Sequence, residues 1–242
     1  MSQATTHPAD PHAAHGHDDH HAVYTDAPAG FVPHKVAHHY DTPVQEFAAG
    51  KFAFWLFLAT EVMLFGGMFA GYFIFHTLYP ETFKAGGHEL NWKLGALNTT
   101  ILLFSSFTMA LGVRSAQTSK KGPMLGLMAV TVLCGFGFLV VKYFEYSAKV
   151  EHGLLPGHLF HGHGDIAAVP HIATFFAIYW TMTGIHGLHV IIGMALIVWA
   201  MKGAAANRYH AGYYLPVDLV GIYWHLVDLI WIFLFPLLYL VP

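Results

Sequence analysis

Ionisable side chains stand inside long apolar segments of this sequence, where each could bind a metal, relay a proton or join two helices. Glu61 lies in FLATEVMLFGG, with no cation within one helical turn along the sequence. His186 and His189 lie in TGIHGLHVIIG, and His225 and Asp228 lie in YWHLVDLIWIFLF. A charge at the centre of a bilayer costs about 2.5–3.5 kcal/mol even on the mildest scale, so each group needs a partner. The set predicts hydrogen bonds between helices or, alternatively, a buried metal site or a proton relay.

The spacing of these groups limits their chemistry. His186 and His189 are three residues apart and project from one side of a helix, which excludes them as opposite axial ligands of one haem. His225 and Asp228 have the same spacing, so the carboxylate could orient the imidazole. Glu61 could be a protonated acid that is hydrogen-bonded to a neighbouring helix, or a proton-active group.

Two further pairs have helical spacing. Lys142 and Glu145 are three residues apart, which predicts an ion pair along one helix. Asn98 and Ser105 are seven residues apart and share a face, where polar residues usually bind a neighbouring helix. Both pairs are therefore interpreted as structural contacts.

No sequence pattern for nucleophilic or redox catalysis accompanies these residues. The sequence has no Gly-rich phosphate loop, no CxxCH haem-attachment motif and no Cys-containing copper motif. Its one cysteine, Cys134, lies in an apolar segment, which excludes a disulfide framework and any multi-cysteine metal site. We expect no catalytic residue and no metal ligand in this chain.

The elements that must position the polar groups are five apolar segments, at about 52–78, 94–116, 124–148, 172–201 and 217–241. Each exceeds the ~20 residues that a helix needs to cross the hydrocarbon. Of the 242 residues, 55% are hydrophobic and 10% are charged, whereas soluble domains have about 25% charged residues. The net charge of −3, without a Lys/Arg run, indicates no nucleic-acid partner. The sequence predicts an all-α membrane protein, a bundle of five transmembrane helices.

Residues 1–51 differ from the rest of the chain, because they are rich in His, Asp, Ala and Pro and have no hydrophobic periodicity. We predict a disordered tail followed by a membrane domain over residues 52–242. Lys and Arg are more numerous on the tail's side of the membrane, which predicts a cytoplasmic N-terminus and a C-terminus outside.

Histidine is abundant in the tail, which holds nine of the chain's 20 histidines before position 40. Imidazoles titrate near pH 6.5, so the tail could collect protons, or it could be a solvated spacer or an incidental metal-chelating tract. The proton-antenna candidates are His7, His12, His15, His17, His20 and His21. A second histidine cluster lies in the segment 152–171.

Four ordered motifs resemble subunit III of the haem-copper oxidases, the terminal respiratory oxidases. They are FLATEVMLF at 57–65, LNTTILLFSS at 97–106, TGIHGLHVIIG at 183–193 and YWHLVDLIWIFLF at 223–235. A looser match, GFLVVKYFEY, has Lys142 where the family usually has Gln. The resemblance covers the last five helices of the family's seven-helix form, and the His-rich tail stands in place of the first two.

The resemblance implies a non-catalytic subunit of a bacterial oxidase that transfers electrons from cytochrome c to oxygen, with haem and copper in the partner subunits. It implies contacts with subunit I, with subunit II and with a small subunit IV. It also implies bound phospholipid, support of proton uptake, and a location in the cell's inner membrane. The residues expected to set lipid and subunit contacts are Glu61, Asn98, His186, His189, Lys202, His225 and Asp228. Of these, Lys202 stands nearest to the family's lipid-headgroup arginine.

Other functions remain open at this point. Quinol oxidases have five-helix third subunits, and nitric oxide reductases have a related accessory protein. The Glu in FLATEVMLF favours the cytochrome c type. A stand-alone proton or metal transporter, built on Glu61 and the intramembrane histidines, is the alternative from another class.

Overall fold

The computed structural model describes residues 24–156, 160, 166 and 168–240, and this part of the chain forms six helices. They are α1 (Pro43–Leu78), α2 (Pro80–His88), α3 (Trp92–Gln117), α4 (Lys121–Glu151), α5 (Ile172–Ala205) and α6 (Leu215–Tyr239). All but α2 are long and apolar enough to cross a membrane, which confirms the predicted all-α, five-span architecture. The sequence did not predict α2, because its nine residues are too polar and too short to stand out as a span.

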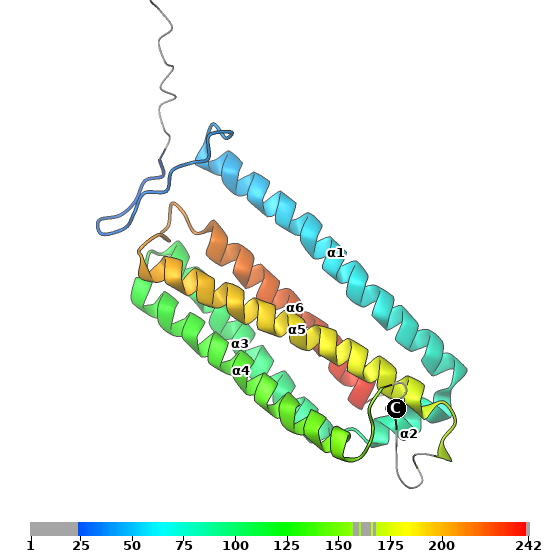
Figure 1. Cartoon of the computed structure of the whole chain (residues 1–242). Coiled ribbons are helices and arrows are strands. Elements are labelled where there is room, and N and C mark those ends of the chain that lie inside the picture. The colour runs from blue at the N-terminus through cyan, green and yellow to red at the C-terminus, as the bar shows by residue number, and fades with distance from the viewer. Residues whose placement is uncertain (1–23, 157–159, 161–165, 167, 241–242) are drawn as a thin grey trace, which may run out of the picture.

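Helix α1 begins at Pro43, earlier than the apolar segment that starts near residue 52. The Thr42 side chain accepts a hydrogen bond from the backbone N–H of Gln45, at 3.2 Å, and Pro43 occupies the first helical turn. The first turns are too polar for a hydropathy signal. A helix of 36 residues is about 54 Å long, which is well beyond the ~30 Å thickness of the hydrocarbon core. The N-terminal end of α1 extends past the ends of the other helices (Figure 1).

Helices α3, α4, α5 and α6 form a closed bundle in which each helix contacts two neighbours (Figure 1). The core of the bundle holds large aromatic side chains, among which Trp224 and Trp231 are fully buried. Gly193 permits this packing, because a Cβ atom there would lie 2.8 Å from the Trp224 ring. The bundle therefore provides the rigid frame for the polar groups inside it.

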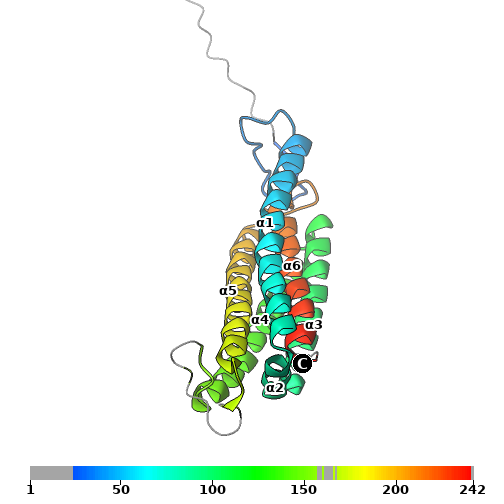
Figure 2. The same cartoon turned by 90° about the vertical axis from the view of Figure 1, so that its right-hand side faces the viewer.

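Helix α1 lies along one side of this bundle, against α6 and α5 (Figure 2). In its most apolar stretch only 11% of the residues are buried within the chain, compared with 50% in α6. The Tyr72 hydroxyl donates a hydrogen bond of 2.5 Å to the Leu237 carbonyl of α6. Lys51 pairs with Asp218 at 2.8 Å near the other end. A few polar contacts thus attach a helix that is otherwise exposed.

Residues 24–42, here called the N-terminal strap, pack against the loop between α5 and α6. The Val32 N–H donates to the Asn207 carbonyl at 3.0 Å, and the His34 ring stacks on Tyr213 with centroids 3.5 Å apart. His34 also contacts the Glu46 carboxylate at 3.0 Å. The predicted disordered tail of residues 1–51 is therefore wrong for residues 24–51. The strap is held by these contacts, and residues 43–51 belong to α1.

The loop beneath the strap carries a buried histidine, His210. Its Nδ1 accepts a hydrogen bond from the Gly212 N–H at 3.2 Å. Burial lowers the pKa of His210 below its ordinary value, so the neutral ring is favoured. Burial also raises the pKa of the neighbouring Tyr213 to about 12. The strap therefore covers uncharged aromatic groups at neutral pH.

Candidate functional site

Glu61 and His189 join α1 to α5 across the gap between them. Glu61 Oε2 lies 2.8 Å from His189 Nε2, and the ring's Nδ1 lies 2.8 Å from the Ile185 carbonyl. A carbonyl can only accept, so Nδ1 carries a proton. The second contact then has one further proton, which either Glu61 or the imidazole donates. The pair is electrically neutral in both forms, which limits the cost of placing it in hydrocarbon.

Two serines of α3 bind the polar residues of α6. The Asp228 carboxylate lies 3.4 Å from the Ser105 hydroxyl, which also accepts a hydrogen bond of 3.0 Å from Trp224 Nε1. His225 Nδ1 lies 2.6 Å from the Ser106 hydroxyl. The sequence suggested that Asp228 orients His225. In the structure both residues bind to serines of α3, and Ser106 interacts with His225 and Asp228 alike.

His186 and Asn98 are completely buried inside the bundle. The His186 ring packs against Trp231, with centroids 5.0 Å apart, and against Phe138, at 5.5 Å. Within the described part of the chain, neither ring nitrogen of His186 and neither amide atom of Asn98 has a hydrogen-bond partner. His186 faces the bundle core, whereas His189, one turn along, faces α1.

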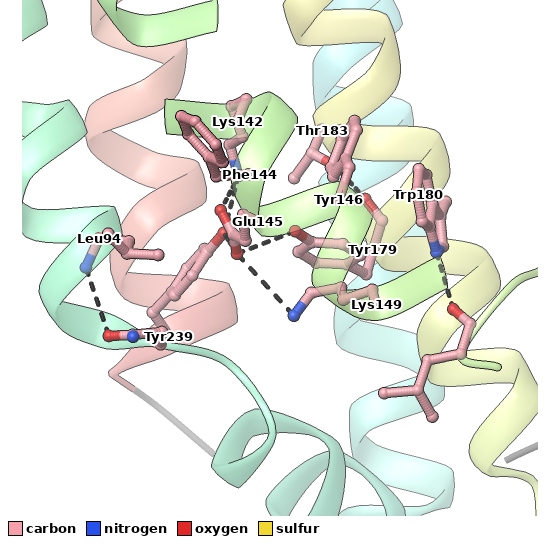
Figure 3. A network of polar contacts seen from close by, with 12 residues as sticks. Leu94, Lys142, Phe144, Glu145, Tyr146, Lys149, Tyr179, Trp180, Thr183 and Tyr239 are labelled. Carbon is pink, nitrogen blue, oxygen red and sulfur yellow. Dashed lines mark hydrogen bonds and ion pairs between the residues drawn. The ribbon is translucent and has the colours of Figure 1, made fainter. Parts of the chain in front are cut away.

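Lys142 and Glu145 form the predicted ion pair, at 2.9 Å, in a polar network at the α4–α5–α6 junction (Figure 3). The hydroxyl of Tyr239 donates to Glu145 Oε1 at 2.6 Å and accepts from Lys142 Nζ at 2.7 Å. Tyr179 donates to the same Oε1 at 3.0 Å, and Lys149 Nζ lies 4.0 Å from it. The side chains of Lys142 and Glu145 are 6% and 2% exposed, so this is a buried ion pair.

Aromatic rings complete the surroundings of Lys142. Its Nζ lies 4.7 Å from the Trp231 ring centroid and 5.3–5.7 Å from those of Tyr239, Tyr179 and Tyr146. Rings at such distances attract a cation. The sequence predicted Lys142 and Glu145 from their spacing, but it missed the tyrosines. Only Lys149, four residues beyond Glu145, had a comparable local signal.

The remaining predicted residues lie elsewhere. Lys202 is exposed in the last turn of α5, 13 residues from His189 and so about 20 Å along the helix. The six antenna histidines lie outside the described residues, as does most of the second histidine cluster. Within the described ranges, no group of three or more His, Cys, Asp or Glu side chains is placed to hold a metal ion.

Two apolar grooves flank α1 where it stands off from the bundle. The α1/α5 groove has a volume of about 350 Å³, and its walls include Gly71, Phe75 and Ile178. The α1/α6 groove has a volume of about 550 Å³, and its walls include Trp55, Met63 and His225. Both volumes fall within the range of about 300–1,000 Å³ that is typical of small-ligand sites.

Comparison with known proteins identifies relatives along most of the chain. The family model of cytochrome c oxidase subunit III matches residues 166–241. A probable cytochrome c oxidase subunit 3 of Nocardia farcinica is 31% identical over 189 residues, 77% of this chain and 85% of the relative. The cytochrome c oxidase subunit 3 of Thermostichus vulcanus is 33% identical over 76% of this chain and 84% of its own.

Quinol oxidase subunits are similar to this chain as well. A probable quinol oxidase subunit 3 of Staphylococcus haemolyticus is 27% identical over 204 residues, 83% of this chain and 93% of the relative. Three observations point to the same family. They are the five helices long enough to span a membrane, the motifs around Glu61, His189 and Asp228, and these relatives. The chain belongs to the subunit III family of the haem-copper oxidases and is a multi-pass protein of the bacterial inner membrane.

Proposed function

We propose that this chain is a non-catalytic subunit of an oxidase that passes electrons from cytochrome c to oxygen. It braces the catalytic subunit, holds phospholipid beside it and supports proton uptake. Haem and copper are held by the partner subunits. The ionisable groups of this chain support such a role, because Glu61 bonds to His189 between α1 and α5, and Glu145 of α4 accepts hydrogen bonds from Tyr179 of α5 and Tyr239 of α6. Such contacts hold the helices of the bundle together.

The observation that carries the lipid part of the proposal is the open α1/α5 groove. One of its walls is α1, which the Glu61–His189 bond joins to α5 further along the helices. Its lining is apolar apart from the Thr174, Thr181 and Tyr72 hydroxyls. A groove of this kind, open to the bilayer, suits an acyl chain. Lys202, exposed at the end of α5, is our candidate for a phospholipid headgroup contact.

The test is purification of the complex in the mildest detergent that retains lipid, from cells with and without this chain. We expect co-purification of a haem-containing large subunit, oxidation of reduced cytochrome c, and lower turnover at high pH when this chain is missing. A Gly71→Trp substitution fills the α1/α5 groove and should lower the amount of bound phospholipid. A complex without haem, or turnover and lipid content that do not depend on this chain, would contradict the proposal.

A quinol oxidase is the second candidate, because the Staphylococcus haemolyticus relative named as a quinol oxidase subunit is matched over more of this chain than the cytochrome c oxidase relatives above. The same purified complex distinguishes the two. Oxygen consumption with a reduced quinol but not with reduced cytochrome c would favour the quinol type, and a copper-containing second subunit would favour the cytochrome c type.

A further inference from the structure

The α1/α6 groove contains an imidazole among its apolar walls. Its walls include Trp55, Val62 and Met63 of α1 and Ile222, His225 and Leu229 of α6. Met63 is 76% exposed and Leu229 is 50% exposed, so the groove is open to whatever surrounds the protein. Among these six side chains, only those of His225 and Trp55 carry a nitrogen that can form a hydrogen bond.

His225 lies deep in the membrane. It is ten residues from the start of α6, about 15 Å along a helix of 25 residues that spans about 37 Å. Because the hydrocarbon core is about 30 Å thick, this position falls near its middle. Neither water nor lipid headgroups normally reach this depth.

One nitrogen of this imidazole has no hydrogen-bond partner in the part of the chain that the structure describes. Nδ1 is hydrogen-bonded to the Ser106 hydroxyl at 2.6 Å. Among the described residues, Nε2 has no hydrogen-bond partner. Nε2 is not completely buried, so it is accessible from the groove. Nε2 donates or accepts depending on the tautomer, and in either case it is a polar atom facing hydrocarbon. A polar atom without a partner is unfavourable there.

The surface on the other side of the bundle has a different character at the same depth. Ser106 marks the level of His225 on α3, and the exposed side chains around it are Leu103, Phe104 and Phe107, each 50–59% exposed. On the adjoining α4, Leu133 and Phe136 are 67% and 61% exposed. Such a surface is suited to acyl chains. An acyl chain would leave His225 Nε2 without a partner, whereas a protein helix can supply a hydrogen-bonding group.

We propose that the α1/α6 groove is the docking surface for a transmembrane helix of the haem-containing large subunit, and that a polar group of that helix binds His225 Nε2. The inference rests on the proposed function, since it requires that this chain assembles with such a subunit. Weakly buried α1 supplies one wall of the surface, so docking would also bury a helix that the chain alone leaves exposed.

Site-specific photo-cross-linking in the intact membrane complex tests the position of the surface. A benzophenone amino acid at Met63 should give an adduct that mass spectrometry maps to a transmembrane peptide of the haem-containing subunit. The same amino acid at Leu133, which is similarly exposed on α4, should give lipid adducts. If the amino acid at position 63 reacts only with lipid while the haem-containing subunit co-purifies, the α1/α6 groove is not the docking surface, but the proposed function stands. If no haem-containing subunit co-purifies, the proposed function itself fails.

Substitution of His225 tests the hydrogen bond. His225→Leu should weaken retention of the large subunit roughly three- to tenfold during detergent washing, which is the effect of one hydrogen bond. His225→Gln should retain it, because the amide can still bond. Ser106→Ala removes only contacts inside the chain, with His225 and Asp228, and should leave retention unchanged. Equal losses in His225→Leu and Ser106→Ala, or none in His225→Leu, would overturn the role of Nε2.

Discussion

Removal of the Glu145 charge is expected to destabilise the protein strongly. In Glu145→Gln, Lys142 stays buried without a counter-charge, and Lys149 keeps only the carboxylate of Glu89. At an effective dielectric constant near 20, the 2.9 Å contact is worth about 6 kcal/mol and the 4.0 Å contact about 4 kcal/mol before desolvation. After the desolvation balance, loss of one partner of a buried pair costs about 3–5 kcal/mol. For a chain of this length that lowers Tm by roughly 6–20 °C.

Lys142→Gln should cost less, about 1.5–3 kcal/mol, which is the value of one hydrogen bond to a charged group. Glu145 then keeps Lys149 and the hydroxyl donors of Tyr179 and Tyr239. The double variant Lys142→Gln/Glu145→Gln should lose less than the sum of the single variants, because the two charges are removed together.

The assay is thermal unfolding of the purified protein in one detergent, followed by tryptophan fluorescence, since Trp231 lies 4.7 Å from Lys142 Nζ. Glu151→Gln is the matched control, because it removes an exposed carboxylate from the end of the same helix. If Glu145→Gln unfolds within a degree of Glu151→Gln, or if the losses in the double variant are additive, the buried pair does not stabilise the protein in this way.

Three other predictions concern contacts outside this network. Gly86→Ala should lower stability by about 1–3 kcal/mol, measured as Tm, because its Cβ would lie 2.3 Å from the Phe175 ring. Glu61→Leu should cost about 1–3 kcal/mol by leaving His189 without its partner, while Glu61→Gln should stay close to the parent Tm. Lowering the pH from 7.5 to 5.5 should release the N-terminal strap, measured as faster tryptic cleavage within it, and His210→Phe should abolish that pH dependence.

The pH prediction follows from the direction of the His210 shift. Its pKa is lower when the strap is docked than when it is released, so the released form takes up a proton first. Docking is therefore strongest above the ordinary value near 6.5 and weakens, by at most about tenfold per pH unit, as the pH falls toward the lowered pKa. Cleavage that slows at low pH would contradict this direction.

Each of the other two predictions has its own control. Gly184→Ala has open space around the added methyl group and should leave Tm unchanged or slightly higher. An equal fall in Tm for both alanine variants would contradict the clash with Phe175 as the cause, because Gly184→Ala adds a methyl group in open space and raises helix propensity. For Glu61, equal losses in the Gln and Leu variants would show that its charge matters more than its hydrogen bond.

Much of the fold could be predicted from the sequence because it depends on local properties. Each long apolar segment must form a helix in hydrocarbon, where every backbone polar group needs a partner within the segment. Lys142 and Glu145 were predicted for the same reason, since a spacing of three fixes their proximity on any helix. Hydropathy did not locate the start of α1 or the existence of α2, because both depend on polar first turns, caps and packing.

The sequence by itself determined which residues are polar inside the membrane and that each would need a partner. Only the tertiary structure decided which residues on other helices these groups contact. Glu61 meets His189 across 128 positions, and Tyr239 meets Glu145 across 94. Neither contact has a local signal, because it depends on which helices are neighbours and how each is rotated. Helix rotation also turned His186 of α5 into the core and His225 of α6 toward an open groove, although both are histidines within apolar segments.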